Sequence, residues 1–184
     1  MGYKTMDANE AVSRVSYKFT EIAGIYPITP ASPMAEKVDV LASKREINFW
    51  GNKVKVIEME SEKGAIATVH GALQAGVLAT TYTASQGLLL MIPSIYKMAG
   101  EMLPGVIHVA ARSLSTHSLS IFGDHQDIYA VRQTGACMLS SSSVEEAYHM
   151  AMVSHLASIK SSLPFITVSY THLRAHETAA NLVC

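Results

Sequence analysis

Short apolar segments alternate with helical patterns along this chain, and this alternation limits the folds open to it more than any other feature. Five apolar segments are typical of buried strands: residues 54–57, 77–83, 105–111, 136–139 and 164–168. The stretches between them carry helix signals, such as the capping box formed by Ser143 and Glu146. Strands and helices that alternate in this way form βαβ units. The sequence therefore predicts an α/β fold, with a mainly parallel sheet and helices on both of its faces.

The N-terminal part of the chain predicts two helices with a short strand between them. Asp7 and Glu10 form a D-x-x-E variant of the capping box, and apolar residues at helical spacing follow. We expect Gly24 to end this first helix, because glycine readily adopts the left-handed conformation found after a helix. Residues 25–28 then predict a short strand, and the second helix is expected over residues 32–43.

The composition is typical of a folded protein and argues against several other classes. Apolar residues make up 49% of the 184 residues and charged residues only 16%, whereas a disordered chain combines low hydrophobicity with high charge. The net charge of −1, with scattered lysines and arginines, predicts neither nucleic-acid nor membrane binding. No apolar run approaches the ~20 residues that span a bilayer. The N-terminus also lacks the apolar core of a signal peptide, so we expect a cytoplasmic protein.

Metal and disulfide sites find little support in the sequence. Cys137 and Cys184 are too few for a disulfide framework, an iron–sulfur cluster or a cysteine zinc site. Asp124, His125 and Asp127 offer possible metal ligands, but polar residues at the start of a helix are better interpreted as helix caps. Four further histidines have no partner at ligand spacing and are interpreted as core or surface residues: His70, His108, His149 and His155.

Three polar residues follow predicted strands, at the places where parallel α/β sheets usually bind ligands. Thr29 lies in the turn after the first strand, Glu62 in the first turn of a helix expected over residues 61–74, and Arg112 at the end of the strand at 105–111. Each also has a structural interpretation: Thr29 as a turn residue, Glu62 as a carboxylate favoured by the helix dipole, and Arg112 as part of an ion pair. The residues alone leave both kinds of interpretation open, and the chain contains no recognisable phosphate-binding motif.

Four longer segments resemble a single protein family. They are residues 26–36 (YPITPASPMAE), 56–65 (VIEMESEKGA), 83–93 (TASQGLLLMIP) and 114–125 (LSTHSLSIFGDH). Together they resemble the N-terminal, pyrimidine-binding domain of the pyruvate:ferredoxin (flavodoxin) oxidoreductases, and the resemblance extends over residues 4–168. It implies a homodimer of much longer chains with thiamine diphosphate, Mg²⁺ and [4Fe–4S] clusters. The implied reaction converts pyruvate and coenzyme A to acetyl-CoA and CO₂, with ferredoxin or flavodoxin as the electron acceptor.

The resemblance also implies a role for each of the three strand-end residues. Glu62 matches the glutamate that activates thiamine, and a carboxyl group suits this task because it can share a proton with the pyrimidine nitrogen. Arg112 matches the arginine that binds the pyruvate carboxylate, for which its planar set of donors is well shaped. Thr29 matches a threonine that contacts the substrate through its hydroxyl group.

The boundaries of the resemblance suggest that the chain is a truncated part of an enzyme. Residues 1–168 would form the pyrimidine-binding domain, while the remaining domains of the same enzyme would bind the diphosphate, the Mg²⁺ and the clusters. Residues 169–184 depart from the family and resemble a translated sequencing adapter, so we predict a non-native tail. Two alternatives stay open: the isolated chain is an inactive structural fragment, or the enzyme is a homologous oxidoreductase for another 2-oxo acid.

Overall fold

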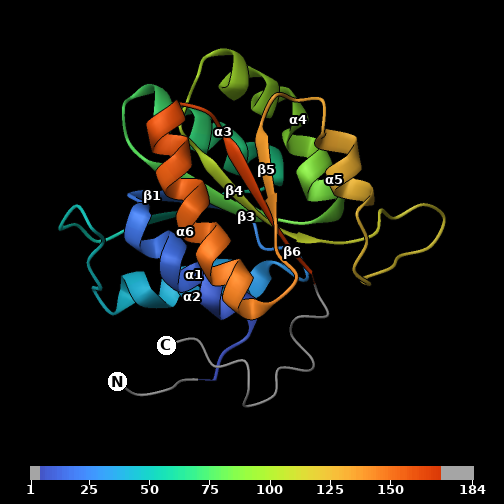
Figure 1. Cartoon of the computed structure of the whole chain (residues 1–184), viewed down its shortest axis with the longest axis horizontal. Coiled ribbons are helices and arrows are strands. Elements are labelled where there is room, and N and C mark those ends of the chain that lie inside the picture. Colours follow the sequence, from blue (N-terminus) through green and yellow to red (C-terminus); the bar gives the residue numbers. More distant parts are fainter. Residues whose placement is uncertain (1–4, 171–184) are drawn as a thin grey trace.

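The described residues, 5–170, form a parallel sheet of six strands with helices on both sides (Figure 1). In this computed structural model the strands are β1 (Ile22–Ile25), β2 (Lys55–Glu58), β3 (Ala79–Thr83), β4 (Val106–Ala111), β5 (Cys137–Ser140) and β6 (Phe165–Tyr170). They lie side by side in the order β2-β1-β3-β4-β6-β5, and every neighbouring pair is parallel. The α/β fold predicted from the alternating pattern is confirmed.

Two helical layers cover the sheet, one on each face (Figure 1). The helices are α1 (Ala8–Phe19), α2 (Ser32–Ser43), α3 (Glu62–Gln74), α4 (Ser85–Gly100), α5 (Gln126–Val131) and α6 (Val144–Ser161). Helices α1, α2 and α6 bury one apolar cluster, which includes Val12 and Met34, and helices α3, α4 and α5 bury the other, which includes Ile66 and Met91. The core is therefore divided by the sheet into two halves.

The prediction for the end of the first helix is wrong. Helix α1 ends at Phe19, because Thr20 is extended and its hydroxyl donates to the carbonyl oxygen of Ser16 at 2.7 Å. The strand also begins earlier than predicted, at Ile22 rather than at residue 25, and Gly24 lies inside it. A Cβ at Gly24 would lie 2.6 Å from the carbonyl oxygen of Ala65 on α3. Glycine at this position thus allows α3 to pack closely against β1.

The later elements begin and end within two residues of their predicted bounds, and β6 extends further than expected. Ser169 and Tyr170 continue this strand and pair with Ala110 and Ala111 of β4. These two residues are the first of the predicted tail, and its remainder, residues 171–184, lies outside the described part of the chain. None of the helices within residues 5–170 combines the length and hydropathy needed to cross a membrane.

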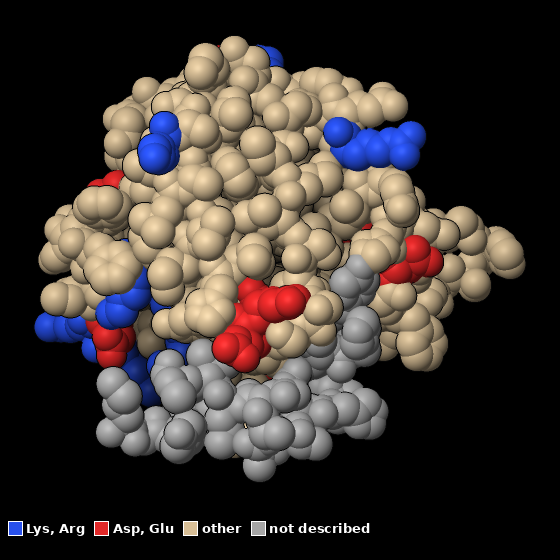
Figure 2. Space-filling view, in the orientation of Figure 1, with Lys and Arg blue, Asp and Glu red and all other residues tan. Residues whose placement is uncertain are grey.

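Charged side chains are few on the upper and central part of the face shown in Figure 2, and they gather toward its lower edge. This view has the orientation of Figure 1, in which α6 lies across the front of the sheet. Helix α6 exposes the apolar residues Val153, Leu156 and Ile159. The appearance of this face agrees with the low charged fraction of the whole sequence, 16%.

A layer of polar side chains is buried between the sheet and helices α1 and α6, and we call it the buried polar layer. Its first part joins α1 to β3: the hydroxyl groups of Ser16 and Tyr82 lie 2.7 Å apart, and those of Thr20 and Thr80 lie 2.8 Å apart. Burial raises the pKa of Tyr82, so this side chain stays protonated. All four side chains are buried, and each hydroxyl group has a partner within the chain.

The second part of the buried polar layer is a pair of histidines. The Nε2 atoms of His108 on β4 and His155 on α6 lie 3.2 Å apart, and Nδ1 of His108 is bonded to the hydroxyl of Thr167 on β6. Burial lowers the pKa of His155 to about 3 and also lowers that of His108, so both rings are neutral near pH 7. The interpretation of these two as core histidines is confirmed. The two residues have no partner at metal-ligand spacing in the sequence, and the fold brings their rings together from positions 47 residues apart.

Candidate functional site

The three sequence-predicted site residues follow three of four adjacent strands in the sheet. Thr29 follows β1, Glu62 opens α3 just after β2, and Arg112 follows β4. The strand order β2-β1-β3-β4 places these positions along one edge of the sheet, and the turn between β3 and α4 lies among them. We call this region the carboxyl edge. It is where a ligand is expected in a parallel α/β sheet.

Arg112 is buried at the carboxyl edge without a charged partner. Its side chain is only 6% exposed, and Nη1 donates to the carbonyl oxygen of Thr29 at 2.6 Å. Within residues 5–170, no carboxylate forms an ion pair with the guanidinium, and its Nε is buried without an acceptor. The structural ion pair considered for Arg112 is therefore not formed. A buried donor without an acceptor costs free energy, so this group is suited to binding an anion.

Thr29 lies against Arg112, with its backbone fixed and the residue exposed. Its carbonyl oxygen accepts from Arg112, and the next carbonyl, that of Pro30, accepts from Nδ2 of Asn9 at 3.1 Å. The residue itself is exposed. The structure thus brings Thr29 and Arg112 together, which supports a shared role, and it leaves the threonine hydroxyl accessible from outside.

Glu62 is the first residue of α3 and is buried beside the start of α4. Ser61 caps α3 by accepting from the backbone N–H of Gly64 at 3.2 Å. Glu62 is 7% exposed, yet its carboxylate has no hydrogen-bond donor among the residues that the structure describes. A buried carboxylate normally has donors around it. Glu62 therefore has bonding capacity that the described chain does not meet.

Gly87 allows the side chains of Glu62 and Thr83 to pack closely against the start of α4. A Cβ at this position would lie 2.8 Å from Oε1 of Glu62 and 2.6 Å from Oγ1 of Thr83, too close for either contact. The hydroxyl of Thr83 is buried and, like the carboxylate of Glu62, has no partner among the described residues. Two polar groups with unmet bonding capacity thus lie side by side near the first turn of α4.

The neighbouring part of the carboxyl edge does not fit a diphosphate. A hollow of about 400 Å³ lies at the ends of β1 and β2, and three acidic side chains line it: Glu36, Asp39 and Glu58. Their negative charge would repel phosphate groups. This hollow is therefore a poor place for the charged end of thiamine diphosphate.

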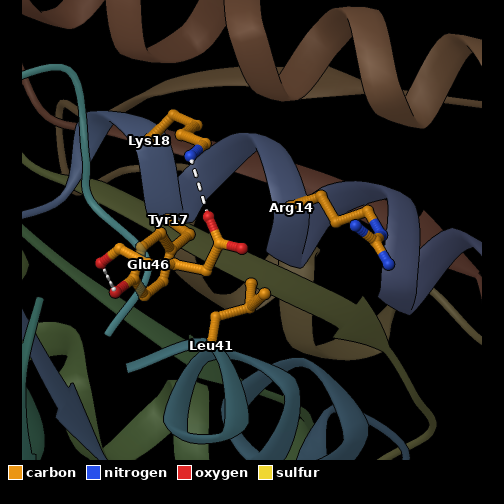
Figure 3. A pocket seen from close by; sticks show the side chains of 5 residues that line it. All are labelled: Arg14, Tyr17, Lys18, Leu41 and Glu46. Carbon is orange, nitrogen blue, oxygen red and sulfur yellow. Dashed lines mark hydrogen bonds and ion pairs between the residues drawn. The ribbon is translucent and has the colours of Figure 1, made fainter. Parts of the chain in front are cut away.

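A second hollow, of about 80 Å³, lies between α1 and the segment after α2 (Figure 3). The hydroxyl of Tyr17 donates to the carbonyl oxygen of Glu46 at 2.6 Å, and Nζ of Lys18 lies 3.5 Å from the Glu46 carboxylate. Arg14, at its rim, pairs with Glu10 at 2.8 Å. These polar groups find their partners within the chain, so the hollow is a weaker candidate for a ligand site than the carboxyl edge.

Asp127 is a residue of the carboxyl edge that the sequence interpretation missed. It is fully buried, and its Oδ2 accepts the backbone N–H of Ser85 at 2.8 Å and that of Arg112 at 3.1 Å. The interpretation of Asp127 as a helix cap is wrong. Asp124 accepts the N–H of Gln126, the first residue of α5, whereas Asp127 lies within this helix and joins it to the start of α4 and to the residue that follows β4. No local pattern signals such a role.

Comparison with known proteins agrees with the resemblance seen in the sequence. Residues 14–181 match the family described as "Pyruvate flavodoxin/ferredoxin oxidoreductase, thiamine diP-bdg". The chain is 58% identical over 174 residues to the pyruvate-flavodoxin oxidoreductase of Klebsiella pneumoniae, and this match covers 95% of the chain. It is also 58% identical over 166 residues, or 90% of the chain, to the pyruvate:ferredoxin oxidoreductase of Moorella thermoacetica. The chain spans 15% and 14% of the lengths of these two relatives.

A solved structure shares the fold. It is the 2-oxoglutarate:ferredoxin oxidoreductase from Magnetococcus marinus with 2-oxoglutarate, coenzyme A and succinyl-CoA bound. The TM-score is 0.80 at 24% sequence identity, and the match covers 94% of this chain and 30% of that one. At this identity the likeness supports the arrangement of helices and strands and nothing more specific.

Proposed function

Because the chain belongs to the pyruvate flavodoxin/ferredoxin oxidoreductase family, in its thiamine diphosphate-binding domain, we propose that it is the pyrimidine-binding part of an enzyme that oxidises pyruvate. The proposed reaction converts pyruvate and coenzyme A to acetyl-CoA and CO₂, and ferredoxin or flavodoxin accepts the electrons. The names of the two relatives at 58% identity support pyruvate as the substrate and this class of acceptor.

One observation carries the proposal: two buried polar side chains with unmet bonding capacity lie at the carboxyl edge. The carboxylate of Glu62 has no donor among the described residues, and Nε of Arg112 has no acceptor. Leaving such groups unpaired lowers the stability of the fold. Both become satisfied if Glu62 bonds to a heterocycle and Arg112 to a carboxylate.

Glu62 would act on the proton of the cofactor ring. Thiamine diphosphate, when bound, supplies a carbon nucleophile for the keto carbon of a 2-oxo acid. The Glu62 carboxylate, which is only 7% exposed, would share a proton with the pyrimidine nitrogen. The hydroxyl of Thr83 offers a second polar contact, and Gly87 allows both groups to lie close to the start of α4.

Arg112 and Thr29 would hold the substrate. The guanidinium already uses Nη1 to bind the Thr29 carbonyl, which leaves the buried Nε for the carboxylate of pyruvate. The exposed Thr29 would offer its hydroxyl to the bound 2-oxo acid. In this arrangement the two residues fix the orientation of the substrate, and Glu62 prepares the cofactor.

The other components of the reaction are assigned to the rest of a longer enzyme. Following the family resemblance, we assign the diphosphate site, Mg²⁺ and the [4Fe–4S] clusters to parts of the protein outside this chain. We also propose that the enzyme is a homodimer in the cytoplasm. The acidic hollow at the ends of β1 and β2 supports a diphosphate site formed elsewhere.

The substitution Arg112→Lys in the full-length enzyme tests this proposal. Lysine keeps the positive charge but lacks the planar set of donors, so kcat/KM for pyruvate should fall by roughly ten- to a hundredfold. Bound thiamine diphosphate should stay at the wild-type amount, because Arg112 is assigned to the substrate. Loss of the cofactor would contradict this assignment. A wild-type preference for another 2-oxo acid over pyruvate would contradict the proposed substrate.

A further inference from the structure

Asp127 joins three segments of the carboxyl edge through one side chain. Its Oδ2 accepts the N–H of Ser85, after β3, and the N–H of Arg112, after β4, at 2.8 and 3.1 Å. Its Oδ1 accepts the N–H of Ile128 in its own helix, α5, at 2.8 Å. The carboxylate is fully buried, and within residues 5–170 it has no cationic partner. Its bonds are therefore all to backbone groups whose positions it can fix.

The turn held by Asp127 has an unusual backbone. Ser85 has φ of 50°, in the left-handed region that residues other than glycine rarely adopt. It is fully buried, and its hydroxyl donates to the carbonyl oxygen of Ser113 at 2.7 Å. The turn after β3 is therefore tied to residue 112 through Asp127 and to residue 113 directly. Such a conformation persists only where surrounding contacts enforce it.

Arg112 is thereby held at both of its ends. Asp127 fixes the backbone N–H, and the carbonyl of Thr29 holds Nη1 of the guanidinium at 2.6 Å. Nε, between these two fixed points, is the buried donor without an acceptor. A small displacement at either end would change the direction of this donor. The geometry of the free donor thus depends on a carboxylate that does not touch it.

We propose that Asp127 is a positioning residue that sets the backbone of Arg112, and with it the direction in which the guanidinium presents its free donor to the substrate carboxylate. This inference rests on the proposed role of Arg112 in substrate binding. Ser85 completes the arrangement, because its hydroxyl holds the residue that follows Arg112. Burial raises the pKa of the Asp127 carboxyl. The hydrogen bonds from the N–H groups of Arg112 and Ser85 act in the opposite direction, because they favour its ionised form.

The test uses Asp127→Asn in the full-length enzyme, with Asp124→Asn as the matched control. Asparagine has the size of aspartate but lacks its charge, and its amide nitrogen cannot accept a bond from a backbone N–H. We expect kcat/KM for pyruvate to fall about tenfold, mainly through KM, because a displaced binding group weakens orientation of the substrate. Asp124 is exposed and bonds only the nearby N–H of Gln126, so its variant should match the wild type.

A double variant separates positioning from a general effect on the fold. If Asp127 acts through Arg112, adding Asp127→Asn to an Arg112→Ala enzyme should cause no further loss of kcat/KM. A further loss of about tenfold in that background would overturn the inference, as would an unchanged KM in Asp127→Asn alone. An Arg112→Ala enzyme with unchanged kcat/KM would instead overturn the proposed function of Arg112. The two failures are thus distinguishable.

A second variant keeps the inference testable if Asp127→Asn does not fold. Ser85→Ala removes the hydroxyl that bonds to Ser113 and contacts the Gln86 side chain, and it leaves the Asp127 carboxylate in place. We expect roughly a threefold rise in KM for pyruvate, again absent in the Arg112→Ala background. Exchange of the C2 hydrogen of bound thiamine diphosphate with deuterated water should stay at the wild-type rate, because that step is assigned to Glu62. An unchanged KM would overturn the inference. A rise in KM accompanied by slower C2 exchange would overturn it as well.

Discussion

The carboxyl edge and the buried polar layer both bury polar side chains, but they differ in whether those side chains are satisfied. In the buried polar layer, Tyr82 is bonded to Ser16 and His108 to both His155 and Thr167. At the carboxyl edge, Glu62 has no donor among the described residues, and Nε of Arg112 has no acceptor. The difference teaches that burial of polar groups does not by itself indicate a site. Unmet bonding capacity is what separates the proposed ligand site from the region that holds the fold together.

The largest expected effect is on chemistry at the carboxyl edge. Glu62→Gln in the full-length enzyme keeps the size of the side chain, but an amide cannot share a proton with the pyrimidine nitrogen. Exchange of the C2 hydrogen of bound thiamine diphosphate with deuterated water should slow by ~10²–10⁴, with the cofactor still bound. Substitution of Glu60 by Gln is the matched control. Unchanged exchange would mean that Glu62 is only a carboxylate favoured by the helix dipole. The contrast between the two regions would then lose its basis.

The next largest effect is on stability, and it belongs to the buried polar layer. His108 and His155 have pKa values below that of an unfolded histidine because burial disfavours the charged ring. Below about pH 6.5 the unfolded chain binds protons that the folded chain does not bind. Stability is therefore full above this pH, and it falls as the pH drops toward 3, by up to about 1.4 kcal/mol per pH unit for each histidine.

Denaturant unfolding between pH 7 and pH 4 checks this expectation. His155→Gln removes one titrating ring, so the decrease in the free energy of unfolding should be shallower than in the wild type. His149 is exposed, and His149→Gln should leave the slope unchanged. Equal slopes in the wild type and His155→Gln would contradict the assignment of this pH dependence to the buried pair.

A smaller effect is expected when a hydroxyl group of the buried polar layer is removed. Thr20→Val keeps the shape of the side chain but breaks the bonds to the Ser16 carbonyl and to Thr80. The free energy of unfolding should fall by about 1–3 kcal/mol, because buried polar partners are left unpaired. Thiamine C2 exchange should be unaffected in the full-length enzyme. Slower exchange in Thr20→Val would show that the two regions are not separate in function.

The smallest expected effect is that of the cofactor on the isolated chain. Thiamine diphosphate with Mg²⁺ should leave its Tm unchanged, because the described residues offer groups for the ring but an acidic surface where phosphates would lie. Thermal unfolding with and without millimolar ligand measures this. A clear rise in Tm would mean that the chain binds the diphosphate itself and that the carboxyl edge is a complete site.

Local patterns in the sequence predict the elements of this fold well. The Asp7 cap of α1 and the Ser143 cap of α6 are found as expected, because capping depends on residues three positions apart. Gly24 is the exception. Glycine is typical of helix ends, but here it serves the close approach of Ala65 on another element. A pattern within one segment carries no information on what packs against it.

The candidate site is only partly predictable for the same reason. Sequence places Thr29, Glu62 and Arg112 at strand ends, since the end of each strand is a local feature. Asp127 was missed because its bonding partner Ser85 lies 42 residues away in the chain. The histidine pair joins residues 47 positions apart. Both arrangements depend on the order of the strands in the sheet, which a single sequence does not specify.

The strand order also has a consequence for how the chain folds during synthesis. Strand β6 comes last of the described strands, yet it lies between β4 and β5, and β5 pairs with β6 alone. Until residues 165–170 leave the ribosome, β4 has an unpaired edge and β5 has no neighbour to join. Such non-local pairing delays folding and exposes strand edges to other chains. We therefore expect nascent chains that stop before β6 to need a chaperone, and those that include it to become resistant to protease.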